Sequence, residues 1–264
     1  MVETTLNYLA PMEERPYFYT YPPPPGVPGR KSHGDRRRVE VHDARELEQP
    51  SLDVEGFALV PFASALADAF DRAEVARTYY PEVEALVRRC TSAGRVLAFD
   101  HNVRNTDRAS AESDLSQGPV HFVHNDYTQR SGPQRVRDLV GGEEAERLLQ
   151  RRFAVINVWR PIRGPVQQAP LAFCDASSLA QLDFVPTDLR YRDRVGEVYS
   201  LNYRPEHRWF YYPGMRADEA LLLKCYDSDA RFACFTAHTA IDDPTAPAGA
   251  APRESIEVRT LAFF

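Results

Sequence analysis

A histidine and an aspartate stand two positions apart in residues 120–126, VHFVHND. If this segment is extended, His124 and Asp126 point to the same face, because side chains alternate along a strand. An imidazole and a carboxylate that converge in this way supply two ligands of the 2-His-1-carboxylate set, which binds non-haem Fe(II) and leaves coordination positions open. A His-x-Asp pair also occurs by chance, so a third ligand further along the chain has to support a metal site.

A second histidine and a carboxylate-binding pair follow in an order that suits this chemistry. His238 lies near the end of a predicted strand, 114 residues after His124. Arg253 and Ser255 open the last predicted strand, where a guanidinium and a hydroxyl two residues apart can hold one carboxylate together. This order of elements favours a metal site with an anion anchor beside it.

The main alternative for the third metal ligand is His207, which lies 83 residues after His124. It precedes two further predicted strands, and we therefore favour His238. We interpret the remaining candidates as solvated or structural histidines: His33, His42 and His101.

Five further residues stand where a substrate could meet the predicted centre. Arg104 precedes the His-x-Asp segment and could bind a substrate carboxylate. Asn157 and Trp159 share one face of a predicted strand and Arg160 takes the other, so either face could line a cavity. Tyr127 directly follows the aspartate and could support the ligands from outside. Ordinary structural roles are the competing interpretation of these side chains.

The composition excludes several classes of function. The chain has 264 residues, of which 43% are hydrophobic and 27% charged, so it can bury a sizeable core. Its net charge of −6 offers no basic face, which argues against a nucleic-acid partner. No stretch approaches ~18 apolar residues, so we expect no membrane partner. The first residues do not consist of a basic segment followed by an apolar run, so we expect no signal peptide.

Cysteine and arginine usage bear on the compartment and the source. The four cysteines form no C-x-x-C pair: Cys90, Cys174, Cys225 and Cys234. We interpret them as reduced, mostly buried thiols, which predicts a cytoplasmic protein without a disulfide or zinc framework. The chain has 30 arginines and only two lysines, a bias that we attribute to a GC-rich bacterial genome. A homodimer is one possible assembly.

The periodicity of apolar residues changes character near residue 153. Before it, spacings of three to four residues predict helices over residues 64–79, over 82–90 after Pro81, and over 133–152 with an interruption at Gly141-Gly142. After it come seven short β-type runs: FAVINVWR, APLAFC, EVYSLNY, RWFYY, EALLLKCY, FACFTAHTA and SIEVRTLAFF. This pattern favours an antiparallel sandwich or barrel backed by helices.

The first 50 residues differ from the rest of the chain. They are rich in proline and charge and include the run YFYTYPPPP, which cannot form a helix and favours an extended path. Tyrosines are scarce in disordered tails, so we expect an extended arm over residues 1–50 that lies on the body. Residues 51–264 are then predicted to form a single domain.

Several segments together resemble the asaB hydroxylase/desaturase family, which includes a cephamycin 7-alpha-methoxylation component and fungal gibberellin desaturases. The resemblance covers most of the chain and is most specific in its last third: NVWRPI, PLAFCDASS, HRWFYYPGM, LLLKCYDS, AHTAIDDPTAP and APRESIEVRTLAFF. It implies a mainly β fold with flanking helices, built on a double-stranded β-helix (jelly-roll or cupin-like) core. It also implies Fe(II) as cofactor, with 2-oxoglutarate and O2 as co-substrates.

The resemblance assigns roles to individual residues. His124, Asp126 and His238 correspond to the catalytic iron ligands, while Arg253 and Ser255 correspond to the anchor for the distal carboxylate of 2-oxoglutarate. The spacing from His238 to Arg253 is longer than in many oxygenases with this pattern. Arg259 is therefore retained as an alternative anchor.

We expect an oxygenase that oxidises a C–H bond of a small metabolite, such as an amino acid or a natural-product intermediate, in bacterial secondary metabolism. Hydroxylation, desaturation and ring closure are all open outcomes. One alternative is a non-catalytic partner that binds a metabolite and assists another biosynthetic enzyme. Another is a metal-dependent isomerase or lyase, which would consume no O2.

Overall fold

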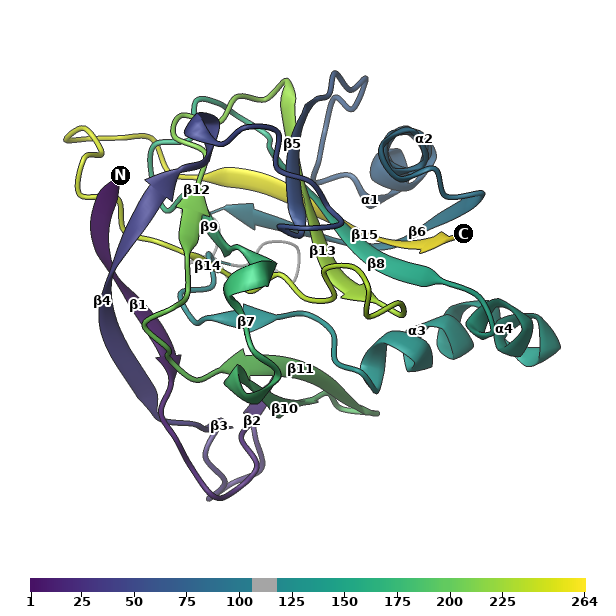
Figure 1. The fold of residues 1–264 in the computed structure, drawn as a ribbon, viewed down its shortest axis with the longest axis horizontal. Coiled ribbons are helices and arrows are strands. Elements are labelled where there is room, and N and C mark those ends of the chain that lie inside the picture. The colour runs from purple at the N-terminus through teal and green to yellow at the C-terminus, as the bar shows by residue number, and fades with distance from the viewer. Residues whose placement is uncertain (106–117) are drawn as a thin grey trace.

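The computed structural model describes residues 1–105 and 118–264, and it is mainly β with few helices (Figure 1). Its strands are β1 (Val2–Leu9), β2 (Tyr17–Tyr19), β3 (Arg30–Lys31), β4 (Gly34–Asp43), β5 (Phe57–Pro61), β6 (Arg95–Asn105), β7 (His124–Asn125), β8 (Phe153–Pro161), β9 (Leu171–Cys174), β10 (Phe184–Arg190), β11 (Val195–Leu201), β12 (Trp209–Tyr211), β13 (Glu219–Asp227), β14 (His238–Ala240) and β15 (Glu254–Phe263). They form a ten-stranded sheet in the order β1-β4-β12-β9-β14-β7-β11-β10-β2-β3 and a five-stranded sheet in the order β5-β13-β8-β15-β6.

The seven predicted runs all contain strands of these sheets, namely β8, β9, β11, β12, β13, β14 and β15. In FACFTAHTA the strand is confined to the last three residues, His238–Ala240. Strands with few apolar residues escaped the sequence pattern. In β4, for example, only one residue is buried, and the backbone is held by antiparallel pairing with β1 and parallel pairing with β12.

The α- and π-helices of the described residues are α1 (Arg72–Glu74), a π-helix (Val75–Tyr79), α2 (Tyr80–Thr91), α3 (Ser131–Val140) and α4 (Gly142–Leu149). The helix predicted from residue 64 begins only at residue 72, so its first part was wrong. Asp71 caps the observed start, and carboxylates of Glu74 and Glu82 accept hydrogen bonds from backbone N–H groups between residues 65 and 68. Those bonds give the backbone partners other than a helical turn.

The predicted break between α3 and α4 is confirmed at Gly141, which has a φ of 71°.

Two apolar clusters lie on the two faces of the five-stranded sheet. Every residue of β8 is buried, because Val155 and Trp159 face the ten-stranded sheet while Ile156 and Val158 face the cluster that includes α2. Asn157 shares the face of Trp159 and therefore points into the space between the sheets. The alternation along β8 thus decides which of its side chains can reach a site between the sheets.

Residues 1–50 are built into the ten-stranded sheet through β1, β2, β3 and β4 (Figure 1). β2 pairs with β10, and the hydroxyl of Tyr8 on β1 accepts a hydrogen bond of 2.7 Å from the indole nitrogen of Trp209 on β12. The segment is extended, as expected, but it supplies strands of the sheet. The division into an arm over residues 1–50 and a single domain over residues 51–264 stays a prediction.

Two further expectations concern cysteines and membranes. All four cysteines are free, with Cys174 and Cys225 buried. Within the part of the chain that the structure describes, no helix is long and apolar enough to cross a membrane.

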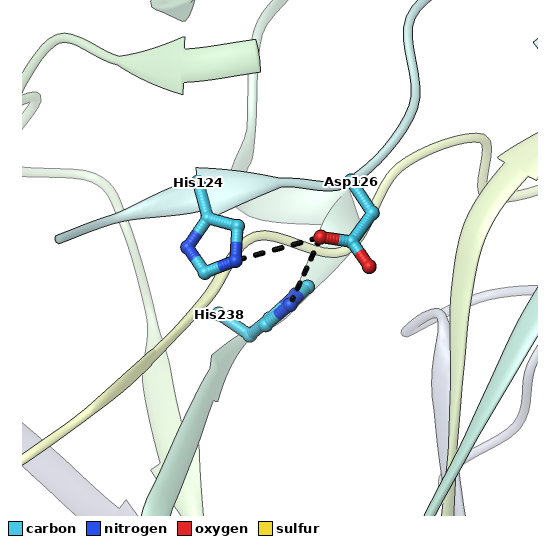
Figure 2. Close-up of side chains that lie close together, drawn as sticks. All are labelled: His124, Asp126 and His238. Carbon is cyan, nitrogen blue, oxygen red and sulfur yellow. Dashed lines mark ion pairs between the residues drawn. The ribbon is translucent and has the colours of Figure 1, made fainter. Parts of the chain in front are cut away.

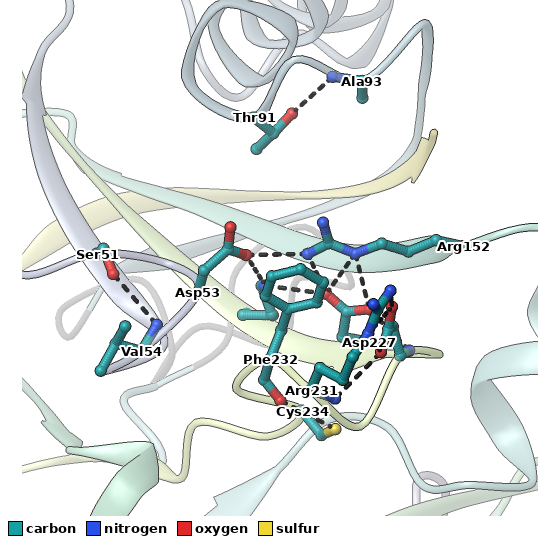
Figure 3. Close-up of polar contacts among 12 residues, drawn as sticks. Ser51, Asp53, Val54, Thr91, Ala93, Arg152, Asp227, Arg231, Phe232 and Cys234 are labelled. Atoms are coloured by element: carbon teal, nitrogen blue, oxygen red, sulfur yellow. Dashed lines mark hydrogen bonds and ion pairs between the residues drawn. The ribbon is translucent and has the colours of Figure 1, made fainter.

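An ion cluster joins Arg152, directly before β8, to Lys224 and Asp227 of β13 and to the half-exposed Asp53 (Figure 3). The Nζ of Lys224 lies 2.9 Å from Asp227 and 2.6 Å from Asp53, and a guanidinium nitrogen of Arg152 lies 2.7 Å from Asp227. The Arg152 guanidinium also stacks over the ring of Phe232, 3.6 Å from its centroid. Lys224 and Asp227 are almost fully buried, so neither charge can regain water if its partner is lost.

Replacing Lys224 by methionine is expected to lower the free energy of unfolding by about 3 kcal/mol, because it leaves the buried carboxylate of Asp227 with one cationic partner fewer. Chemical denaturation monitored by circular dichroism measures the change. The matched control is Lys31→Met, which removes the only other lysine, a half-exposed side chain, and should change stability by less than ~0.5 kcal/mol. Equal unfolding midpoints for the two variants would refute this role of the cluster.

Candidate metal centre

The structure brings His124, Asp126 and His238 together between the two sheets (Figure 2). Their candidate ligand atoms lie within 4.8 Å of one another. The Oδ1 atom of Asp126 is 3.5 Å from Nε2 of His124 and 4.0 Å from Nε2 of His238, so the three atoms face one point. Two imidazoles and one carboxylate in this arrangement match the donor set that holds non-haem Fe(II).

Two short strands position the imidazoles. β7 and β14 are neighbours in the ten-stranded sheet, and His238 pairs directly with His124. In each residue, Nδ1 lies within hydrogen-bond distance of the carbonyl two residues earlier, at 2.7 Å from Phe122 and at 3.0 Å from Thr236. These carbonyls favour the tautomer with the proton on Nδ1, which leaves the Nε2 lone pair free for a metal.

Burial also keeps His124 in the form that binds metal. Desolvation, together with the nearby His238 ring, lowers the pKa of His124 to about 4. The imidazole is therefore neutral at physiological pH, and no proton has to be displaced from it when a metal binds.

The second carboxylate oxygen of Asp126 is held from the five-stranded sheet. Its Oδ2 atom accepts hydrogen bonds from Nδ2 of Asn157 at 2.9 Å and from Nε of Arg259 at 3.0 Å. Burial raises the pKa of this carboxyl, but Arg259 and the two imidazoles outweigh burial, and the pKa lies well below its usual range. The carboxylate is thus ionised and oriented, with Oδ1 directed at the imidazoles.

Replacing Asn157 by leucine is expected to weaken metal binding by roughly 10–100-fold, the usual effect of losing a hydrogen-bond partner of a ligand. Titration of the metal-free protein with Co(II), followed by absorbance, measures the affinity. Asn202→Leu is the matched control, since Asn202 donates to the carbonyl of Leu9, away from the centre. Equal Co(II) affinities in both variants would contradict the orienting role of Asn157.

A pair of unsatisfied donors lies at the start of β15, with Arg253 directly before the strand and Ser255 within it. The Nε of Arg253 and the Oγ of Ser255 are buried and make no hydrogen bond within the described part of the chain. Burial, aided by the nearby Arg104, lowers the pKa of Arg253 to about 9. A buried guanidinium and a buried hydroxyl with free donors suit a carboxylate ligand. The carboxylate would accept a hydrogen bond from each group and balance the charge of the guanidinium.

One cavity contains both the triad and the guanidinium of Arg253. Arg104, Trp159 and Glu257 also line it, and the guanidinium of Arg253 lies 5.7 Å from the centroid of the Trp159 ring. Sequence reasoning missed Glu257. The signal was available, because Glu257 continues the alternation that begins at Arg253 on the same strand.

The other predicted residues fall outside this cavity. Asn157 and Arg259 hold Asp126, and Arg259 also lies 3.0 Å from Asp100, so its guanidinium already has carboxylate partners. Tyr127 lines a neighbouring cavity. Arg160 lies on the opposite face of β8, over the ring of Tyr79 at 5.1 Å, because the strand alternation turns it toward α2. The assignment of Arg160 to substrate binding therefore has no support in the geometry.

The rival ligand His207 is held elsewhere. Its Nδ1 lies 3.1 Å from the hydroxyl of Tyr8 and its Nε2 lies 3.0 Å from Asp183. Both ring nitrogens are engaged in this buried chain, which ties β1 to the segment before β10. His207 therefore lies in a hydrogen-bonded chain away from the triad, and the choice of His238 as the third ligand stays a prediction.

Asn125 is a second residue that sequence reasoning missed. It is fully buried between the two ligands of the His-x-Asp segment. Its Nδ2 donates to the carbonyls of Tyr127 and Cys225, at 2.7 and 2.9 Å, and its Oδ1 accepts from the backbone of Thr236 at 3.2 Å. Asn125 therefore connects the segment that carries His124 with the segment that leads to His238.

Comparisons with known proteins agree with this geometry. The family model described as "Oxidoreductase/YMDC permease-like domain" matches residues 6–263. The chain is 34% identical over 254 residues to the Fe(II)/2-oxoglutarate-dependent dioxygenase nvfI of Aspergillus novofumigatus, covering 93% of this chain and 90% of that protein. It is 31% identical to the hydroxylase/desaturase poxK of Penicillium oxalicum, covering 93% and 85%.

A solved structure is similar over nearly the whole chain. The iron and alpha-ketoglutarate-dependent endoperoxidase NvfI superposes with a TM-score of 0.89 at 31% identity, covering 99% of this chain and 97% of that one. These relatives are fungal enzymes, so they do not support the bacterial origin expected from arginine usage. The finer resemblance to the asaB family stays a prediction.

Proposed function

Because the chain belongs to the oxidoreductase family whose model matches residues 6–263, and is a non-haem Fe(II)- and 2-oxoglutarate-dependent dioxygenase like the relatives nvfI and poxK, we propose that it oxidises a C–H bond of a natural-product intermediate. The observation that carries the proposal is the shared cavity. The three candidate metal ligands and a buried arginine with a free donor face the same space.

The side chains of the candidate site that could do chemistry have proposed parts. Nε2 of His124, Nε2 of His238 and Oδ1 of Asp126 hold Fe(II), and Arg253 with Ser255 binds the distal carboxylate of 2-oxoglutarate. With Fe(II) and 2-oxoglutarate bound, reaction with O2 gives succinate and CO2 and supplies the oxidising power for the substrate C–H bond.

The remaining side chains orient the reactants and keep water out. Trp159, which is 3% exposed, closes the cavity from β8. Arg104 and Glu257 offer charges of opposite sign to polar groups of the substrate. We assign the anchor to Arg253 and not to Arg259, because the carboxylate of Asp126 already engages the guanidinium of Arg259.

We further propose that the core is a double-stranded β-helix. Two groups of four neighbouring strands would form it, β6-β15-β8-β13 in one sheet and β7-β14-β9-β12 in the other. The apolar cluster between the sheets supports this assignment, for instance through Phe57 and Phe173, whose ring centroids are 4.4 Å apart. In such a core the metal ligands come from one sheet and the carboxylate anchor from the other.

The experiment that tests the function is succinate formation by pure protein with Fe(II) and 2-oxoglutarate, screened over natural-product intermediates under air and under nitrogen. We expect succinate that depends on O2 and rises with one class of compound. Turnover of substrate under nitrogen would instead indicate an isomerase or lyase. Binding of a metabolite without any succinate would indicate the non-catalytic partner, which no observation in the structure favours.

A further inference from the structure

A second cavity, of about 570 Å³, is lined by Asp126 and extends between α3 and the β10–β11 pair. Asp126 lines both this cavity and the one that contains the triad and Arg253. A molecule that fills the second cavity therefore contacts Asp126, one of the three candidate metal ligands. Its volume lies within the ~300–1,000 Å³ range of sites that bury drug-sized ligands, which is more than a free amino acid needs.

The wall formed by β10, β11 and the turn between them carries an apolar patch beside the charged residues Arg194 and Glu197. It presents Leu189, Tyr191 and Val195, and Val195 is 56% exposed although its side chain is hydrophobic. Gly196 makes room for the tyrosine, because a Cβ at this position would lie 3.2 Å from the Tyr191 ring. This wall suits a flat or aliphatic body.

The opposite wall is polar. Ser131, Gln134, Arg135 and Asp138 line the cavity from one face of α3, at the spacing of successive helical turns. A ligand between the two walls therefore meets the apolar patch on one side and the polar side chains of α3 on the other.

The carboxylates of the cavity already have partners. Asp100 and Asp126 each lie 3.0 Å from the guanidinium of Arg259. Asp138 accepts a hydrogen bond of 2.8 Å from Gln134. Glu197 accepts from Thr128 and Arg15. Little negative charge is left to bind a cationic ligand.

Two arginines of the cavity, Arg135 and Arg194, make no close ion pair with the described residues. Arg194 makes no ion pair with the described residues and lies over the ring of Tyr191, 4.3 Å from its centroid. Arg135 reaches Asp138 only at 4.0 Å and lies over the ring of Phe99. Guanidinium groups of this kind bind carboxylates and similar anions readily.

We propose that this cavity binds the substrate, and that the substrate is a drug-sized amphipathic molecule with an apolar body and an anionic group. The body lies against Leu189, Tyr191 and Val195, the anionic group meets Arg135 and Arg194, and the carbon to be oxidised lies at the Asp126 end. The inference rests on the proposed function, since it names the substrate class of the same centre.

A matched pair of fluorescent probes tests the chemistry of the site without the natural substrate. Anilinonaphthalene sulfonate carries an aromatic body and an anionic group, and N-phenylnaphthylamine carries the same body without charge. We expect the sulfonate to bind at least tenfold more tightly. In the double variant Arg135→Gln, Arg194→Gln, this preference should fall roughly tenfold, since two partly exposed ion pairs are lost. Equal affinity of the wild type for both probes would overturn the anionic class.

Variants that fill or alter the walls test the location. Gln134→Trp should abolish binding of both probes, whereas Leu139→Trp, on the same helix but outside the cavity, should leave binding unchanged. Val195→Asp, at an exposed position of the other wall, should weaken both probes even if the tryptophan variant does not fold. Wild-type affinity in folded Gln134→Trp or Val195→Asp would refute the site.

The distance to the metal centre separates this inference from the proposed function. With Mn(II) in the centre, proton NMR signals of the bound sulfonate should broaden, and the broadening but not the binding should be lost in His238→Ala. Binding without broadening in the Mn(II)-loaded wild type would overturn the inference even if the enzyme forms succinate. Broadening in a protein that forms no succinate would leave the site intact and refute the oxygenase function.

Discussion

The variant His238→Ala is expected to lose Fe(II) binding and, with it, all 2-oxoglutarate turnover. Removal of the imidazole leaves only His124 and Asp126, whose ligand atoms face the same point as Nε2 of His238. The loss of affinity should exceed the ~10–100-fold that follows from losing an outer hydrogen-bond partner, because a direct ligand is removed. Titration of the metal-free protein with Fe(II) under nitrogen, alongside a circular dichroism spectrum, measures this effect.

The control for this variant is His33→Ala, which removes an exposed histidine in the N-terminal part of the chain. It should bind Fe(II) as the wild type does. His238 is almost fully buried on β14, so thermal unfolding of the variant has to be compared with that of the wild type. A folded His238→Ala protein with wild-type affinity for Fe(II) would exclude this residue as a ligand.

The second large effect is expected from Arg253→Leu. This change removes the buried guanidinium that we assign to the distal carboxylate of 2-oxoglutarate. Loss of one partner of a buried, hydrogen-bonded charge pair costs ~2–5 kcal/mol, so the KM for 2-oxoglutarate should rise by about 30-fold or more. Fe(II) affinity should stay unchanged, because Arg253 does not contact the triad.

Two further substitutions sharpen this prediction. Ser255→Ala removes one hydrogen bond to a charged group and should raise the same KM by about tenfold. Arg253→Lys keeps the charge but not the two-pronged geometry, and should recover only part of the affinity. The control Arg151→Leu, at an exposed position, should change neither constant. If Arg253→Leu kept the wild-type KM while Arg259→Leu raised it, the anchor would have been assigned to the wrong arginine.

The sequence was sufficient for the parts of the site that depend on strand alternation. His124 and Asp126 share a face because they are two residues apart, and the same rule places Arg253 and Ser255 together at the start of β15. The rule also placed Asn157 and Arg160 on opposite faces of β8, but it could not say which face meets the centre. That choice depends on how the two sheets pack, which lies outside any local pattern.

Other features depend on contacts between distant segments. The hydrogen bonds from Asn157 and Arg259 to Asp126 span 31 and 133 residues, so no local pattern could predict them. The sequence suggested substrate binding for Asn157 and 2-oxoglutarate binding for Arg259, whereas in the structure both side chains hold a carboxylate. The strands β2 and β4 show no clear alternation of apolar residues, and their pairing with β10 and β12 defines them more than their own periodicity does. Likewise, the helix predicted from residue 64 does not form at its start, because backbone N–H groups there donate to the carboxylates of Glu74 and Glu82. Only the folded chain brings these carboxylates into place.

The most direct test of the account is an anaerobic titration of the Fe(II)-loaded protein with 2-oxoglutarate, followed by visible absorbance. Chelation of Fe(II) by a 2-oxo acid produces a charge-transfer band, so the measurement reports the metal and the co-substrate at one site. We predict a saturable band in the wild type, the same band at much higher 2-oxoglutarate concentration in Arg253→Leu, and no band in His238→Ala. A folded wild-type protein that develops no band, or a His238→Ala protein that develops the full band, would contradict the account.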